Sequence, residues 1–364
     1  MVWILIALLL AGLFPAWAEA QAVAPESKWT FELFGGSYAT ESASGGGSPG
    51  SLPAGATFAL ASGRPSRAVS SWYFGDGAVL LNQVLTQFAG STGTSFPRLS
   101  PIESVFQTSQ PLRRNGGGAF GARLGRELTS RIAIEVSVER SLTSLDLDEA
   151  TRAGLKTTSD TFNESFRALL NTSPVTNLAV SSTLDAPTVS NSQTRMAATL
   201  RWSIVNGRRF ELHLLGGGGI ARNSGDSSAA TLTGKYSFRY FGTAPMEETD
   251  SVTVRIAQPK QGAIGVVGGG AIYNFSARSA LRVDFRLQSN SNKVEAILSA
   301  APRVAALTPA DVLSTAAAIS PGLQFSTQAG VRSSLSGPNA NVTVFTGSGR
   351  STQASVTVGL VRRF

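Results

Sequence analysis

Cysteine is missing from this chain, and histidine is nearly so. The 364 residues contain no cysteine and one histidine, His213. Without cysteine there is no disulfide framework, no thiolate metal site and no cysteine nucleophile. A single histidine likewise excludes a histidine-rich metal site. We therefore expect no metal, no cofactor and no catalytic residue in this chain.

Charged residues are also few, at 15% of the chain, and the mean hydropathy is close to zero. A bundle of membrane-spanning helices is thereby disfavoured. The formal net charge of +8 would suit nucleic acid, acidic lipid or an anionic surface. Nucleic acid is disfavoured, because the sequence has no aromatic and basic platform of the kind that single strands need.

One long apolar run stands at the start of the chain. Val2–Phe14 is almost unbroken, Pro15 ends it, and small-x-small patterns follow at residues 16–18 and 18–20. These features predict a secretory signal peptide over residues 1–20 and a mature domain over residues 21–364. No lysine or arginine precedes the run, so an uncleaved anchor stays open. The run is short for a spanning helix, which needs roughly 20 apolar residues.

Eight later segments alternate apolar and polar residues with a period of two. In the clearest of them Leu281, Val283 and Phe285 alternate with Arg282 and Asp284. Such segments have the length that a tilted strand needs to cross a bilayer. The predicted strands lie near residues 28–39, 117–128, 131–145, 193–205, 208–223, 262–275, 279–290 and 351–364. Residues 262–275 contain too many glycines for their two faces to be assigned. Glycine within a strand more often marks close packing than a nucleotide-binding loop.

Short and long connections alternate strictly between these segments. Thr129–Ser130, Asn206–Gly207 and Ser276–Arg278 are short, whereas the other gaps are long. Asn-Gly is a strong hairpin signal, because both residues tolerate positive φ. The pattern predicts an all-β fold: a closed, antiparallel, up-and-down transmembrane barrel of eight strands with long extracellular loops. An even strand number places both mature termini on the periplasmic side.

The long connections contain further patterns. Residues 78–85 and 146–170 have helix-like composition, 308–311 resemble a helix start, and 42–53 are rich in small and flexible residues. Residues 235–240 and 251–256 alternate and predict continuations of the fifth and sixth strands. Residues 323–331 and 341–345 would suit an extra hairpin, which leaves a ten-stranded barrel as an alternative. We expect these loops to pack as a cap over the barrel mouth.

The polar faces of the strands contain acids and bases in near balance. A soluble barrel would place the apolar faces inward, whereas a membrane barrel places the charged faces inward. Eight strands enclose a space that side chains just fill, so the charges would pair across a blocked lumen. The predicted lumen network is Glu32, Arg123, Glu135, Glu139, Arg195, Arg201, Glu211, His213, Arg282, Asp284 and Arg286. His213 is expected to be a paired interior residue.

Aromatic residues gather beside the short connections, as in a girdle at the headgroup boundary. The predicted girdle is Trp29, Trp202, Phe210, Tyr273 and Phe275. The end of the chain resembles the terminal-strand signal of outer-membrane barrels, with a polar residue, a glycine and a final aromatic residue. The positions that carry the resemblance are Thr357, Gly359, Leu360 and Phe364, while Arg362 departs from it.

The glycine-rich strands and short turns resemble the OmpA-like, eight-stranded outer-membrane β-barrel family, without a peptidoglycan-binding domain. The resemblance covers the strands, under half of the chain, and matches nothing in the loops. It implies an outer-membrane location and contact with the barrel-assembly machinery during biogenesis. The functions that remain open are a structural or surface-interaction role towards lipopolysaccharide or another partner, a narrow channel, and a lipid-modifying enzyme, of which we expect the first.

Overall fold

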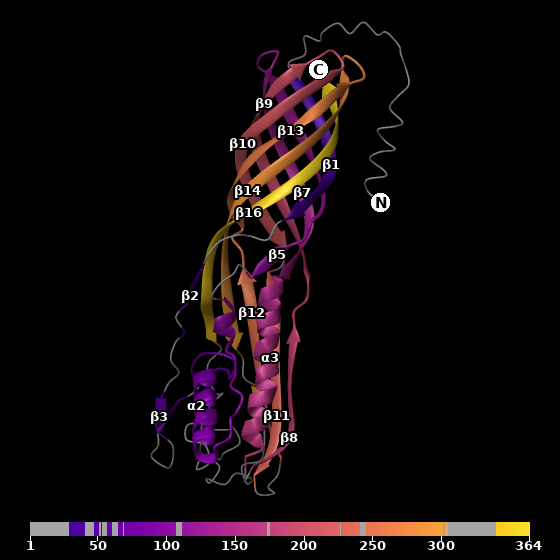
Figure 1. Cartoon of the computed structure of the whole chain (residues 1–364). Coiled ribbons are helices and arrows are strands. Elements are labelled where there is room, and N and C mark those ends of the chain that lie inside the picture. Colours follow the sequence, from indigo (N-terminus) through magenta and orange to yellow (C-terminus); the bar gives the residue numbers. More distant parts are fainter. Residues whose placement is uncertain are drawn as a thin grey trace.

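The computed structural model is mostly antiparallel β-sheet with few helices (Figure 1). It describes residues 29–40, 47–50, 52, 57–59, 65–67, 69–106, 111–172, 175–225, 227–240, 245–300, 303–304 and 340–364. The predicted signal peptide, the helix start at 308–311 and the strand at 323–331 lie outside these residues. No described helix is long and apolar enough to cross a membrane.

Eight strands pair in a cycle, which we call the ring. The pairing runs β1–β6–β7–β9–β10–β13–β14–β16 and returns to β1, because β16 pairs both β14 and β1. Their bounds are β1 (Trp29–Thr40), β6 (Gly117–Glu127), β7 (Ile132–Leu147), β9 (Val189–Asn206), β10 (Phe210–Gly225), β13 (Gln261–Asn274), β14 (Ser279–Ala300) and β16 (Ala340–Arg363). The ring is uneven, since its strands range from 11 to 24 residues.

The sequence predicts eight strands, which matches the ring but not the whole sheet. The sheet that contains the ring has fourteen strands. Part of the ring continues beyond it as an open sheet. β11 (Ser228–Tyr240) follows β10, β12 (Met246–Ala257) precedes β13, and β8 (Val175–Asp185) precedes β9. These strands pair in the order β14–β12–β11–β8. The expected continuations at residues 235–240 and 251–256 belong to β11 and β12.

Where the structure describes them, the long connections that the sequence predicts as loops contain helices and strands. Helix α2 (Gly75–Thr92), the short helix η1 (Ile102–Phe106) and helix α3 (Glu149–Leu170) pack with the open sheet (Figure 1). The short strands are β2 (Gly47–Pro49), β3 (Thr57–Ala59), β4 (Pro65–Arg67), β5 (Leu112–Arg114) and β15 (Arg303–Val304). Within the flexible composition of residues 42–53, β2 pairs with β16 over Gly47–Pro49. We call the open sheet with these helices the extension.

The extension is long and stands end-on to the ring, where the sequence predicts a cap over the barrel mouth (Figure 1). Helix α3 forms because Leu155, Phe162 and Phe166 recur on one face, and all three are buried. Asp148 caps its first turn by accepting a hydrogen bond from the Ala150 N–H. Phe166 stacks on Phe162 and on Tyr236 of β11, with a Phe166–Tyr236 centroid distance of 4.6 Å. The extension therefore has an ordinary apolar core.

Candidate functional site: an ion-paired ring interior

The ring is apolar outside. Large apolar side chains with high exposure lie on or directly beside the ring strands, apart from Val79 and Leu178. Leu33, Val136 and Leu360, for example, are 60%, 51% and 62% exposed. An exposed apolar belt of this extent exceeds what the surface of a water-soluble monomer shows. The belt therefore needs an apolar neighbour.

The interior of the ring is ionic. The eleven residues expected in the lumen all lie there, each no more than 6% exposed. Six of the eight ring strands contribute to the cluster, and glycines of β13 and β16 supply space instead. A Cβ on Gly270 would lie 2.4 Å from the Asp284 Oδ1 atom and 3.0 Å from the His213 Nε2 atom. Gly359 makes room for Glu32 in the same way.

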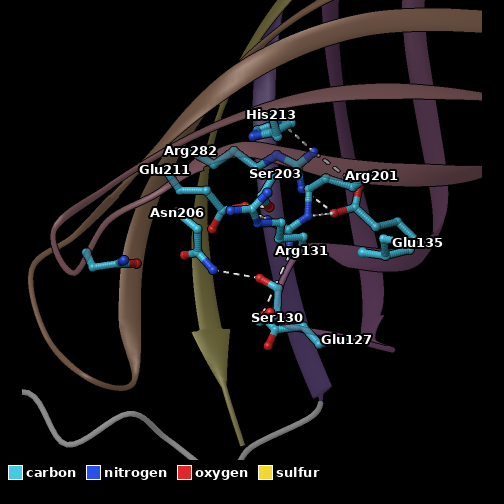
Figure 2. A network of polar contacts seen from close by, with 12 residues as sticks. Glu127, Ser130, Arg131, Glu135, Arg201, Ser203, Asn206, Glu211, His213 and Arg282 are labelled. Atoms are coloured by element: carbon cyan, nitrogen blue, oxygen red, sulfur yellow. Dashed lines mark hydrogen bonds and ion pairs between the residues drawn. The ribbon is translucent and has the colours of Figure 1, made fainter.

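Arg282 and Asp284 form the centre of this network (Figure 2 shows its side nearest the short turns). The Arg282 Nη1 atom donates to Glu135 at 2.7 Å, and its Nε atom donates to Asp284 at 2.8 Å. Asp284 also lies 2.9 Å from Arg123 and 3.0 Å from Arg286. Each carboxylate therefore has at least one guanidinium partner, which is the condition for burying such charges.

The network continues towards both ends of the ring. On the short-turn side Arg201 contacts Glu135 at 3.0 Å and pairs with Glu211 (Figure 2). On the other side Arg195 pairs with Glu139 at 2.6 Å and donates to Gln193 and Gln353. Sequence reasoning missed these two glutamines, although both fall on the polar faces of their strands.

His213 lies inside this network. Its Nε2 atom is 3.0 Å from Asp284 Oδ1 and 3.2 Å from Arg282 Nη2. Among the described residues, its side-chain partners are thus a carboxylate and a guanidinium of the network. No group of metal-ligating side chains occurs in the described part of the chain.

The predicted aromatic girdle lies at the short-turn end of the ring. Trp29, Trp202, Phe210, Tyr273 and Phe275 are between 39% and 53% exposed. Phe210 stands opposite Tyr273 in the pairing of β10 and β13. In the terminal strand Thr357 is buried in the interior, whereas Leu360 and Phe364 are each 62% exposed. Arg126, on the outer face, lies 5.3 Å from the centroid of the Trp29 ring.

A second set of buried acids, which sequence reasoning missed, lies in the extension. Asp250 accepts hydrogen bonds from the Trp72 N–H at 2.5 Å and from the Ser71 hydroxyl at 2.9 Å. Glu248 accepts from the Tyr236 hydroxyl, which also accepts from the Trp72 indole. Burial raises the pKa of Asp250 to about 7. These contacts fasten the segment before α2 to the open sheet.

No protein-family model matches the chain, and no curated protein matches it. Three solved structures show distant likeness. The outer membrane protein OprG from Pseudomonas aeruginosa has a TM-score of 0.37 and 8% identity, covering 93% of this chain and 98% of its own. The outer membrane protease OmpT from Escherichia coli has a TM-score of 0.32 and 9% identity, covering 95% and 99%. The toluene transporter TbuX from Ralstonia pickettii has a TM-score of 0.20 and 12% identity, covering 93% and 90%. Likeness this distant implies no shared activity.

Proposed function

We propose that this chain is an outer-membrane protein with a structural or surface-interaction role. The ring crosses the membrane as a closed eight-stranded barrel of the OmpA-like kind, and the extension stands outside the cell. The lumen network blocks conduction, and the chain is not an enzyme. The Thr357–Phe364 segment serves as the signal read by the barrel-assembly machinery.

The observation that carries this proposal is a change of polarity along β14. One face of this strand contains Arg282, Asp284 and Arg286 inside the ring, and then Val294, Ala296 and Leu298 inside the extension. The opposite face changes from Val283, Phe285 and Leu287, which are largely exposed, to Lys293, Glu295 and Ser299. The surroundings of the strand therefore change from hydrocarbon to water near residues 289–293.

The blocked lumen is supported by the pairing of its charges. Inside the ring, the acids Glu32, Glu135, Glu139, Glu211 and Asp284 pair with the bases Arg123, Arg195, Arg201, Arg282 and Arg286. An ion path would instead require unpaired charge of one sign along an open course. We therefore propose a plug in place of a narrow channel.

The partner on the outer side is proposed to be lipopolysaccharide phosphate. Arg222, Lys260 and Lys293 are exposed where the ring meets the extension. This level adjoins the polar headgroups of the outer leaflet, because the apolar belt ends there. Basic residues at an anionic surface contribute about 1 kcal/mol each, or about fivefold in association.

Insertion and conduction test the barrel and the plug. The purified protein should enter zwitterionic vesicles and resist added protease across the ring. In planar bilayers its conductance should stay at background. A protein that stays in solution without detergent overturns the proposal, and a stable single-channel opening overturns the plug in favour of the channel.

Two triple variants test the lipopolysaccharide contact. R222Q/K260Q/K293Q removes charge next to the membrane, whereas K235Q/R239Q/R255Q removes equal charge from exposed positions on the extension. Binding to vesicles that contain lipopolysaccharide should fall at least tenfold for the first variant and stay near the parent value for the second. Equal binding by both variants would contradict this contact.

A further inference from the structure

An unusual concentration of arginine marks the short-turn end of the ring. Six arginines lie in the three short turns or at the last residues of β16, and we call them the arginine rim: Arg131, Arg208, Arg209, Arg278, Arg362 and Arg363. Five of the six are exposed and Arg363 is half-buried. The described residues of these turns and of the segment 362–364 include no acidic side chain. Glu127, at the end of β6, is half-buried and lies 3.8 Å from Arg201, and the buried Glu211 pairs with the same arginine.

Hydrogen bonds between neighbouring turns hold the rim in place. The Asn274 backbone N–H donates to the Arg209 carbonyl, and its side-chain amide donates to the Arg208 carbonyl. The Arg363 guanidinium donates to the Asn274 side-chain oxygen at 2.8 Å. Asn206 in turn donates to the Ser130 carbonyl at 2.6 Å, which ties the first two turns together (Figure 2). The positive charge is thus spread around the ring at fixed positions.

The rim lies beside the aromatic girdle. Arg209 precedes Phe210 and Arg363 precedes Phe364 in the sequence. Arg126, on the outer face of the ring, lies over the Trp29 ring. Aromatic side chains of a membrane barrel sit at the level of the lipid headgroups. Guanidinium groups at that level face phosphate, to which they can donate paired hydrogen bonds.

We propose that the arginine rim binds anionic phospholipid headgroups, such as phosphatidylglycerol, in the leaflet that faces the short turns. This rests on the proposed membrane insertion. A phospholipid annulus suits the rim better than one protein partner, because the charges encircle the ring instead of gathering on one side. Equal charge removed elsewhere should leave this binding unchanged.

The test is lipid retention by the full-length protein. The intact protein, R208Q/R209Q/R278Q and K235Q/R239Q/R255Q are reconstituted in phosphatidylcholine nanodiscs containing phosphatidylglycerol as a minority lipid. Lipids that stay bound after transfer to detergent are counted by native mass spectrometry. We expect phosphatidylglycerol to be enriched over phosphatidylcholine on the intact protein and on the extension variant. The enrichment should fall at least fivefold on the rim variant.

Each outcome decides between the two proposals. Enrichment that is unchanged in the rim variant, or absent from the intact protein, overturns the lipid site. Arginine-dependent sedimentation with peptidoglycan sacculi, without phosphatidylglycerol enrichment, overturns it as well. Insertion is measured separately by protease resistance in pure phosphatidylcholine, where no anionic lipid is present. A protein that fails there contradicts the barrel, whereas one that inserts without lipid preference contradicts the rim proposal alone.

Discussion

The ring and the extension share one sheet and have opposite polarity. Within the ring, paired ions are buried and apolar side chains are exposed; within the extension, aromatic and aliphatic side chains are buried and polar ones face outward. Strand β14 passes from one to the other without a break. The comparison shows that the solvent on the outer face, more than strand geometry, decides which residues a sheet can place on each side.

The largest expected effect comes from breaking the ionic core of the ring. Arg282→Met removes the shared partner of Glu135 and Asp284, and should destabilise the ring by about 3–5 kcal/mol. Unfolding in urea, followed by the gel mobility of unheated samples, measures this. The double variant R282M/E135Q should recover part of the loss. Full stability of the single variant would contradict the network.

The matching change in the extension removes an aromatic side chain from its core. Phe166→Ala should cost about 3–5 kcal/mol, because Phe166 is only 1% exposed and stacks on Phe162 and Tyr236. Limited proteolysis should then digest the extension while the ring stays resistant. Val79→Ala, at an exposed position, is the control. Simultaneous loss of both regions would show that they unfold as one unit.

One outward face of β14 allows the same substitution in both surroundings. Phe285→Arg places a charge in the apolar belt and should cost about 2–4 kcal/mol in a bilayer. Ile297→Arg, on the same face within the extension, should cost less than about 1 kcal/mol, because water remains available. Refolding yields in vesicles compare the two. Equal costs would contradict a boundary between them.

The smallest effect concerns pH and the extension alone. The pKa of Asp250 is raised to about 7 from 3.8, so the folded state favours the protonated carboxyl. Its contribution is fully present below about pH 3.8 and is lost as the pH rises towards 7. Between about pH 6 and pH 8 the extension should lose about 1.4 kcal/mol, as measured by urea unfolding. Glu248 and Tyr236 are the neighbouring titratable groups. Asp250→Asn should flatten this dependence, and an unchanged slope would exclude Asp250 as its source.

Local periodicity was enough to place the ring residues. In residues 281–288 the alternation alone assigns Arg282, Asp284 and Arg286 to one face, because side chains in a strand alternate strictly. The spacing of Leu155, Phe162 and Phe166 similarly predicts a helix with one apolar face. What this pattern did not reveal was the size of the folded extension or that Asp250 is buried within it.

The sequence by itself determined which residues share a face, where the chain turns sharply and which side chains crowd the short-turn end, since these depend on neighbours along the chain. Only the tertiary structure decided that β12 continues the course of β13 beside β14, that α3 covers the open sheet, and that Arg282 meets Glu135 at 2.7 Å. Those contacts join residues far apart in the chain. Their geometry follows from strand register and from what surrounds each face, neither of which a local pattern contains.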